Sequence, residues 1–250
     1  MLIDTHAHVN FNAYKSDADE VVRRSLAGNT WMINVGSQYS TSKRAVEMAE
    51  KHQEGVYAAI GLHPIHCQEG FDYEEYKKLA GSPKVVALGE IGLDYKAEYV
   101  SSKEKQKEIL LQQLKLAGEM KLPVIFHCRM AHENLIEILK SGILGLEPKG
   151  VIHCFTGHWR EAQQYLQMGF YLGFNGIIFK LNLDEVIKKT PLDRILVETD
   201  CPYLSPPQAS ERNEPLNVKY VVEKIAKLKE KSYEEVGEQT LKNAKELFGI

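Results

Sequence analysis

Short runs of apolar and β-branched residues recur along the whole chain. Runs that are apolar at successive positions are typical of parallel strands buried on both faces. The longer segments between these runs leave room for a helix after each strand. The pattern therefore predicts eight strands, at residues 2–5, 31–35, 56–60, 85–88, 124–126, 151–152, 170–172 and 195–197.

Several of the connecting segments place apolar residues on one face of a helix. Two of them also have the spacing of a capping box, in which a serine and a glutamate three residues later satisfy the first backbone N–H groups. These boxes are expected at Ser101 with Glu104 and at Ser232 with Glu235. The apolar stripes comprise Ile109, Leu110, Leu114 and Ala117, then Leu135, Ile136, Ile138 and Leu139, and finally Val218, Val221, Val222, Ile225 and Leu228.

Eight strands alternating with helices in 250 residues fit an α/β protein with a single (β/α)8 TIM-barrel domain over residues 1–250. A doubly wound open sheet is the alternative. It lacks support because neither G-x-G-x-x-G nor G-x-x-x-x-G-K-[ST] follows an early strand. In a barrel, functional residues gather at the C-terminal ends of the strands, so those positions are the ones to inspect.

The predicted strand ends are rich in side chains that bind metal ions. Alternation along the first strand places Asp4, His6 and His8 on one face. Each histidine alone could be an ordinary hydrogen-bonded core residue, and Glu90 could pair with an arginine. A buried carboxylate needs a partner, however, and a shared metal ion would satisfy Glu90, Asp200 and four histidines together. The residues at the strand ends are His6, His8, His63, Glu90, His127, Arg129, His153, Glu198 and Asp200.

Composition narrows the function classes. Lys and Arg total 31 against 34 Asp and Glu, a formal net charge of −3, so bulk charge does not indicate nucleic-acid binding. No run of 18 apolar residues and no leader with a basic and an apolar region are visible, so neither a membrane span nor a secretory signal is expected.

The four cysteines lack a C-x-x-C spacing, which favours reduced thiols and a cytoplasmic location. Three of them, Cys128, Cys154 and Cys201, directly follow proposed ligands. Strand alternation predicts that they point away from the metal and pack between barrel and helices. An enzyme with a thiol nucleophile is a remote alternative.

Seven motifs stand in order between Asp4 and Pro215: DTHAH, GLHP, GEIGLDY, FHCR, HCFTG, ETDCPYL and RNEP. Together they resemble the TatD family of metal-dependent deoxyribonucleases in the amidohydrolase superfamily. The resemblance implies a barrel with one or two divalent metal ions (Zn, Mn or Mg) that hydrolyses DNA phosphodiesters, often from the 3′ end. It also implies the ligands His6, His8, Glu90, His127, His153 and Asp200, with His63 near the substrate phosphate.

Two positions depart from the family pattern. Many relatives carry an acidic residue where this chain has Met130, and the family's GLHPH reads GLHPIHC here, which displaces His66 by one. Both positions are expected in the cleft. We therefore expect them to affect substrate preference and not metal binding.

Two metal ions could together activate a water molecule and neutralise charge on a phosphodiester. We expect His6, His8 and Asp200 to hold one ion and His127 and His153 the other, with Glu90 between them as a bridge. Asp200 is also the candidate base that accepts the proton of the water. Candidates to fix the scissile phosphate are His63, Arg129 and Arg212.

Other functions stay open on the sequence alone. The same chemistry could hydrolyse an amide or an ester, and a barrel of this kind could also bind metal or a partner without turnover. The expected partner is DNA with single-stranded ends, which need only a few phosphate contacts, and no membrane. The aromatic residues that could stack bases, or simply anchor loops, are Tyr14, Phe155, Trp159 and Tyr203.

Overall fold

A computed structural model describes residues 1–142, 149–209 and 212–250 of the chain. Its described residues contain eight parallel strands, which form one sheet in chain order. All eight predicted runs are strands. The strands are β1 (Leu2–Ala7), β2 (Thr30–Val35), β3 (Val56–Ile60), β4 (Val85–Asp94), β5 (Val124–Arg129), β6 (Gly150–Ile152), β7 (Tyr171–Phe174) and β8 (Ile195–Val197).

The sheet curls round until the segment after β8 meets β1. The backbone N–H of Asp200 donates to the carbonyl of His6 at 2.8 Å, and that of His8 donates to Cys201 at 2.9 Å. A parallel bridge between Ala7 and Cys201 lies at the same seam. The strands therefore make a nearly closed barrel, which confirms the predicted (β/α)8 fold.

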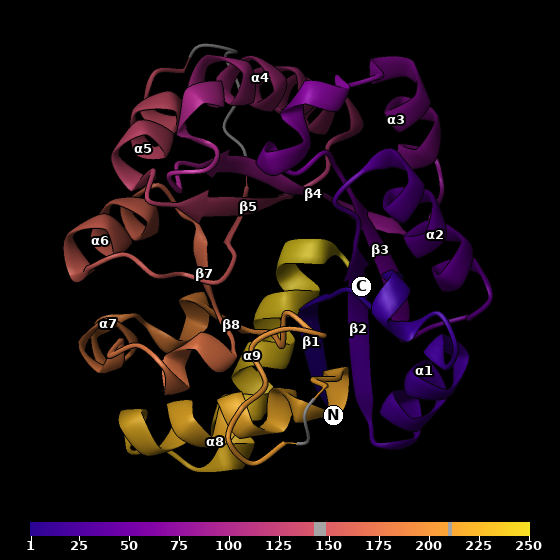
Figure 1. The fold of residues 1–250 in the computed structure, drawn as a ribbon. Coiled ribbons are helices and arrows are strands. Elements are labelled where there is room, and N and C mark those ends of the chain that lie inside the picture. The colour runs from indigo at the N-terminus through magenta and orange to yellow at the C-terminus, as the bar shows by residue number, and fades with distance from the viewer. Residues whose placement is uncertain (143–148, 210–211) are drawn as a thin grey trace.

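Helices surround the strands in a ring (Figure 1). None of the described helices is long and apolar enough to cross a membrane. The helices are α1 (Ala18–Ala27), α2 (Tyr39–Glu50), α3 (Tyr73–Ala80), α4 (Lys103–Met120), α5 (His132–Lys140), α6 (Trp159–Gln167), α7 (Asp184–Lys189), α8 (Val218–Lys229) and α9 (Tyr233–Phe248).

The hydrophobic core has two parts. Inside the barrel, residues near the strand starts, such as Ile3, Val86 and Ile125, pack with Ala244 and Phe248 of α9. Helix α9 therefore covers the end of the barrel where the strands begin, and lies near the centre of the view (Figure 1). The larger part fills the layer between the strands and the outer helices.

The predicted helix stripes make up much of that outer layer. Ile109, Leu110, Leu135 and Val222 are all at most 2% exposed. Burying one aliphatic side chain of this size stabilises a fold by roughly 1.5–3 kcal/mol, so these faces fix how the helices sit on the strands. Of the predicted positions, Leu139 and Leu228 are only partly buried against the core.

One of the two predicted capping boxes is present. Ser232 Oγ accepts the N–H of Glu235 at 3.0 Å, and Glu235 Oε2 accepts the N–H of Ser232 at 2.9 Å. The box predicted from Ser101 to Glu104 is wrong. Ser101 lies in a short 3₁₀ turn before α4, so the N-cap position falls to Ser102, which makes no side-chain cap bond.

Candidate metal centre

Glu90 lies inside β4, not after it. The predicted strand ended at residue 88, but β4 continues to Asp94. Gly92 explains the continuation, because it has φ 149° and a Cβ there would come within 1.9 Å of the His127 carbonyl oxygen. Only glycine allows β4 and β5 to approach this closely. The approach brings Glu90 and His127 to the same end of the barrel.

The first group of donors comes from β1 and the turn after β8. His6 Nε2 and His8 Nε2 lie 3.2 Å apart. Asp200 Oδ1 lies 3.3 Å from His8 Nε2 and 3.9 Å from His6 Nε2. The other nitrogen of His8, Nδ1, lies 2.8 Å from the carbonyl oxygen of Val35, which orients the ring. The structure thus brings together the three residues predicted to share one ion.

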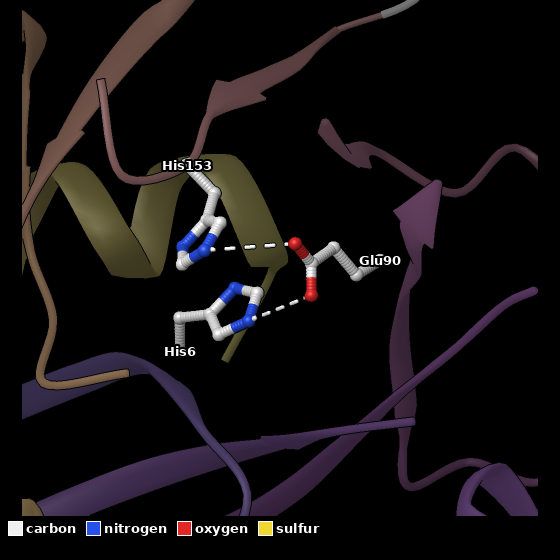
Figure 2. A group of neighbouring side chains, drawn as sticks. All are labelled: His6, Glu90 and His153. Atoms are coloured by element: carbon white, nitrogen blue, oxygen red, sulfur yellow. Dashed lines mark ion pairs between the residues drawn. The ribbon is translucent and has the colours of Figure 1, made fainter. Parts of the chain in front are cut away.

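The Glu90 carboxylate stands between this group and a second one. Its Oε2 atom lies 3.4 Å from His6 Nε2. Its Oε1 atom faces the other side, 2.6 Å from His127 Nδ1, 3.4 Å from His63 Nε2 and 3.6 Å from His153 Nε2. Figure 2 shows this carboxylate reaching both His6 and His153, whose rings are stacked with centroids 3.4 Å apart. The second group therefore includes His63 as well as the predicted His127 and His153.

The spacing of these donors fits a divalent cation. Zinc binds imidazole nitrogen and carboxylate oxygen at about 2.0–2.2 Å, which puts two ligands of one ion roughly 3–3.5 Å apart. The His6, His8 and Asp200 atoms have nearly this spacing. Among the residues that the structure describes, four sets of three potential ligands each have their ligand atoms within 4.8 Å of one another: His6 with Glu90 and His153, His6 with His8 and Asp200, His63 with Glu90 and His127, and His153 with Cys154 and Asp200.

The carboxylates and histidines of the cluster shift one another's pKa values. Burial alone would raise the pKa of Glu90, but the histidines around it hold that pKa well below its usual value. Burial would also keep His153 neutral, yet Glu198 and Glu90 raise the pKa of its ring to about 10. His6, buried and beside His153, has a lowered pKa. A metal ion binds only the unprotonated imidazole nitrogen, so acid should weaken metal binding at this cluster.

Two carboxylates stand behind the cluster: Glu198, which was predicted at a strand end without an assigned role, and Asp94, which was not predicted. Glu198 is 1% exposed and its Oε1 lies 2.9 Å from His153 Nδ1. Asp94 Oδ2 lies 3.0 Å from His127 Nε2. Partners of this kind fix the orientation of a metal-binding imidazole. The sequence did carry a signal, since Asp94 stands at i+4 from Glu90 in a strand and Glu198 stands two residues before Asp200.

Asp4 does not join His6 and His8 as expected. Its carboxylate accepts the backbone N–H of Thr199 at 2.8 Å and the Thr199 hydroxyl at 2.5 Å. The pairing of β1 with β2 shifts between Asp4 and Ala7, which breaks the regular alternation on which the prediction relied. Asp4 therefore ties β1 to the end of β8.

The prediction for the cysteines is wrong at one position. Cys128 and Cys201 are buried as expected, but Cys154 is half-buried and approaches His153 and Asp200. Strand β6 ends at Ile152, and Cys154 has φ 46°, so strand alternation no longer applies to it. Burial raises the pKa of the Cys154 thiol well above its usual value, with Asp200 and Glu198 adding to the shift.

The donor cluster lies in a cleft of about 810 Å³. Met130 and His66, the two departures from the family pattern, both line it, as predicted. His63 and Arg129 line it too. Arg129 is exposed, and no carboxylate in the described part of the chain pairs with its guanidinium.

The structure does not bring Arg212 to this cleft. Its guanidinium pairs with Asp17, donates to the carbonyl of Ala13 at 2.8 Å and lies 4.4 Å from the centre of the Tyr14 ring. Tyr14 and Phe155, two aromatic candidates for stacking, are fully buried. Of the four aromatic candidates, Tyr203 is the one that lines the cleft and is exposed.

A parallel (β/α)8 barrel with histidines and carboxylates at the C-terminal strand ends defines a metal-dependent hydrolase of the TIM-barrel type. The family model described as "TatD related DNase" matches residues 3–249, and the chain belongs to this family. The resemblance found in the sequence is thereby confirmed. The protein is a TatD-family hydrolase, a class of enzymes that act on ester bonds.

Relatives match over their whole length. The chain is 45% identical to the uncharacterized metal-dependent hydrolase YabD of Bacillus subtilis, over 100% of both chains. It is 36% identical to the 3′-5′ ssDNA/RNA exonuclease TatD of Erwinia amylovora, again over 100% of both. The crystal structure of the TatD homologue YJJV of Escherichia coli superposes with a TM-score of 0.91 at 31% identity, covering 100% of this chain and 98% of that one.

Proposed function

We propose that this protein is a metal-dependent exonuclease that removes nucleotides from the 3′ end of single-stranded DNA or RNA. The activity is the one named for the relative from Erwinia amylovora, which matches over the full length of both chains. The cleft supports the proposal, because it joins a cluster of metal-binding side chains to the exposed guanidinium of Arg129, which suits a phosphate. The near-neutral charge of the chain is compatible with a substrate held at one end only.

The placement of Glu90 is the observation that carries the proposal. One carboxylate presents Oε2 to His6 and Oε1 to His127, His63 and His153. A carboxylate with donors on both sides is suited to bridge two metal ions, the arrangement used for in-line displacement at phosphorus. We therefore propose two ion sites, one with His6, His8 and Asp200 and one with His127 and His153, with Glu90 between them.

The remaining roles follow from position and charge. Divalent ions bound there would stabilise charge on a phosphoryl group and lower the pKa of water. Burial would raise the pKa of Asp200, but His8, His153 and His6 hold it below its ordinary value. Its carboxylate is thus ionised at neutral pH and able to accept a proton from an attacking water. His63 and Arg129, at the cleft wall, are placed to hold the phosphate oxygens.

The proposal is tested with a single-stranded oligonucleotide labelled at its 5′ end. The purified protein is stripped with a chelator, reloaded with Mg²⁺, Mn²⁺ or Zn²⁺, and incubated with this substrate. A 3′ exonuclease converts the labelled strand into a ladder that shortens one nucleotide at a time. The same strand labelled at its 3′ end should release the label as a mononucleotide from the start.

A Glu90→Gln variant purified in parallel controls for contaminating nucleases and should be inactive. A duplex with blunt ends should be cut more slowly, because its terminal bases are paired. If no metal supports shortening of any strand while the protein hydrolyses small amides or esters, the nuclease proposal is wrong.

Two further proposals concern the whole chain. We propose that residues 1–250 form one domain, since the eight strands belong to one sheet that runs from Leu2 to Val197 and α9 packs back onto it. A cytoplasmic location stays a prediction from the cysteines, all four of which are free thiols.

A further inference from the structure

Large apolar side chains are exposed around the mouth of the metal-site cleft. Six large hydrophobic residues of the described chain are exposed, and three of them line this one cleft. Single exposed apolar residues are ordinary, but a cluster beside a polar site indicates a binding surface. The three, which we call the apolar rim, are Met130 (73% exposed), Tyr203 (55%) and Leu181 (45%).

The backbone of Tyr203 is anchored next to the donor cluster. Its backbone N–H donates to the carbonyl of Asp200 at 3.0 Å, and its own carbonyl accepts a hydrogen bond from Asn213 Nδ2 at 2.7 Å. Asn213 is 1% exposed and also donates to the Thr199 carbonyl at 3.1 Å. The Tyr203 ring centre lies 6.4 Å from that of His8. The main chain that carries the Tyr203 ring is therefore anchored beside the metal ligands, while the residue itself stays exposed to solvent.

The exposed position of Met130 at the rim does not stabilise the fold. Its φ of 53° lies in the left-handed region, where a residue with a Cβ costs roughly 1–2 kcal/mol relative to a right-handed conformation. The side chain does not recover this cost by burial, since it is the most exposed large hydrophobic residue described. An apolar side chain kept in the open beside the cleft points to a ligand that covers it.

The occupant that fits this rim is an unpaired nucleobase. Proteins that bind single strands without sequence preference combine cations for the backbone with an aromatic ring on which bases stack. Here the exposed Arg129 stands next to Met130 in the same cleft, and Tyr203 supplies the ring face. The rim offers a phenol hydroxyl and a weakly accepting thioether, too few polar atoms to read the edge of a base.

We infer that Tyr203, with Met130 and Leu181, forms a nucleobase platform. The platform holds a base next to the scissile phosphate by stacking and apolar contact, and it does so equally for all four bases. This inference rests on the proposed nuclease function and adds how the site selects single strands. Within a duplex both faces of a base are covered by its stacked neighbours, so a duplex end must fray before such a base can reach the rim.

The test compares two substrates that differ only in their bases. One oligonucleotide is ordinary and the other carries abasic sites at its last three 3′ positions. For the metal-loaded protein we expect kcat/KM on the ordinary strand to exceed that on the abasic strand by about 5- to 150-fold, the effect of 1–3 kcal/mol per stacked base. Tyr203→Ala should lose this advantage, and Tyr203→Phe should keep it. Tyr233→Ala, which removes another exposed tyrosine, is the matched control.

A loss that is equal on both strands would mean that Tyr203 acts structurally, and would overturn the platform. A binding measurement separates the platform from the nuclease function. An oligonucleotide with 2-aminopurine near its 3′ end should lose fluorescence on binding the metal-stripped protein, because stacking quenches this base, and Tyr203→Ala should restore the signal. Quenching by the metal-stripped protein, with no cleavage by the same protein after reloading with Mg²⁺, Mn²⁺ or Zn²⁺, would retain the platform and reject the nuclease. If the base is not quenched by the wild-type protein, the platform is rejected.

Discussion

Glu198 offers the sharpest test of how the barrel prepares its metal site. The side chain is 1% exposed, and its Oε1 atom accepts the N–H of Cys154 at 2.7 Å and the amide of Asn175 at 3.2 Å. The same oxygen lies 2.9 Å from His153 Nδ1. Glu198→Gln keeps the size and this acceptor but removes the negative charge behind His153. We expect the variant to bind metal more weakly.

The expected loss of metal affinity in Glu198→Gln can be estimated from the contacts of this carboxylate. A hydrogen bond to a charged group contributes about 1.5–3 kcal/mol, against about 0.5–1.5 kcal/mol for a neutral one. The difference of about 1–1.5 kcal/mol corresponds to roughly 5- to 13-fold in the dissociation constant. Losing a carboxylate that orients a metal-binding histidine typically costs about 10- to 100-fold. The two estimates overlap near tenfold, which is the loss of metal affinity that we expect.

Stability should fall as well. Glu198 Oε2 has no hydrogen-bond partner in the described residues and lies against Gly173, where a Cβ would come within 2.5 Å of it. In Glu198→Gln the amide N–H₂ takes this place without an acceptor, at a cost of about 1–3 kcal/mol. A chain of this length loses about 2–4 °C in Tm per kcal/mol, so the shift is measurable.

The assay is titration of the chelator-treated protein with Zn²⁺ against a competing indicator, together with thermal unfolding. Glu185→Gln is the control, because Glu185 pairs with Lys189 on the exposed face of α7 at 2.7 Å and lies outside the cleft. The control should match the wild type in both measurements. Metal affinity unchanged in Glu198→Gln, on a folded protein, would refute the view that this carboxylate positions His153.

Three further predictions concern the strand ends. Replacing His6 and His8 together by Ala should abolish hydrolysis and lower the metal content measured by mass spectrometry, while circular dichroism still shows a folded barrel. Asp200→Asn should lower kcat at least about a hundredfold with substrate binding retained, and a near-normal kcat in a metal-loaded variant would remove Asp200 from the mechanism. Burial raises the pKa of Asp4 from 3.8 to about 8, so its contribution to stability is present below pH 4 and is lost as the pH rises to 8. Asp4→Asn should therefore lose less Tm than the wild type between pH 5 and pH 8, and equal losses would contradict the shift.

The order of strands and most of the donor set could be predicted from the sequence. Eight apolar runs are eight strands, and in a barrel their C-terminal ends must meet at one rim. His6, His8 and Asp200 could therefore be placed together although the last two are 192 positions apart in the sequence. The strands are predictable because a strand buried on both faces is apolar at successive positions, and this pattern is visible in the local sequence.

The outcome at Glu90, Cys154 and Arg212 depended on the tertiary structure. Gly92 extends β4 only because β5 lies against it, and Cys154 turns toward the cleft because the strand before it has already ended. Arg212 pairs with Asp17 and does not line the cleft. Each outcome depends on a neighbour distant in sequence or on the residue at which a strand ends. The pattern of residues within one strand predicts neither of these.

Partner choice was also beyond the sequence. Asp94 stands behind His127 because β4 and β5 pair, Glu198 reaches His153 across the barrel end from beyond β7, and Asp4 meets Thr199 across the seam where the barrel closes. Hydrophobic patterning determines which segments become strands, since it acts residue by residue. Which polar groups meet is decided by the stagger of adjacent strands, and that is fixed only when the whole ring packs.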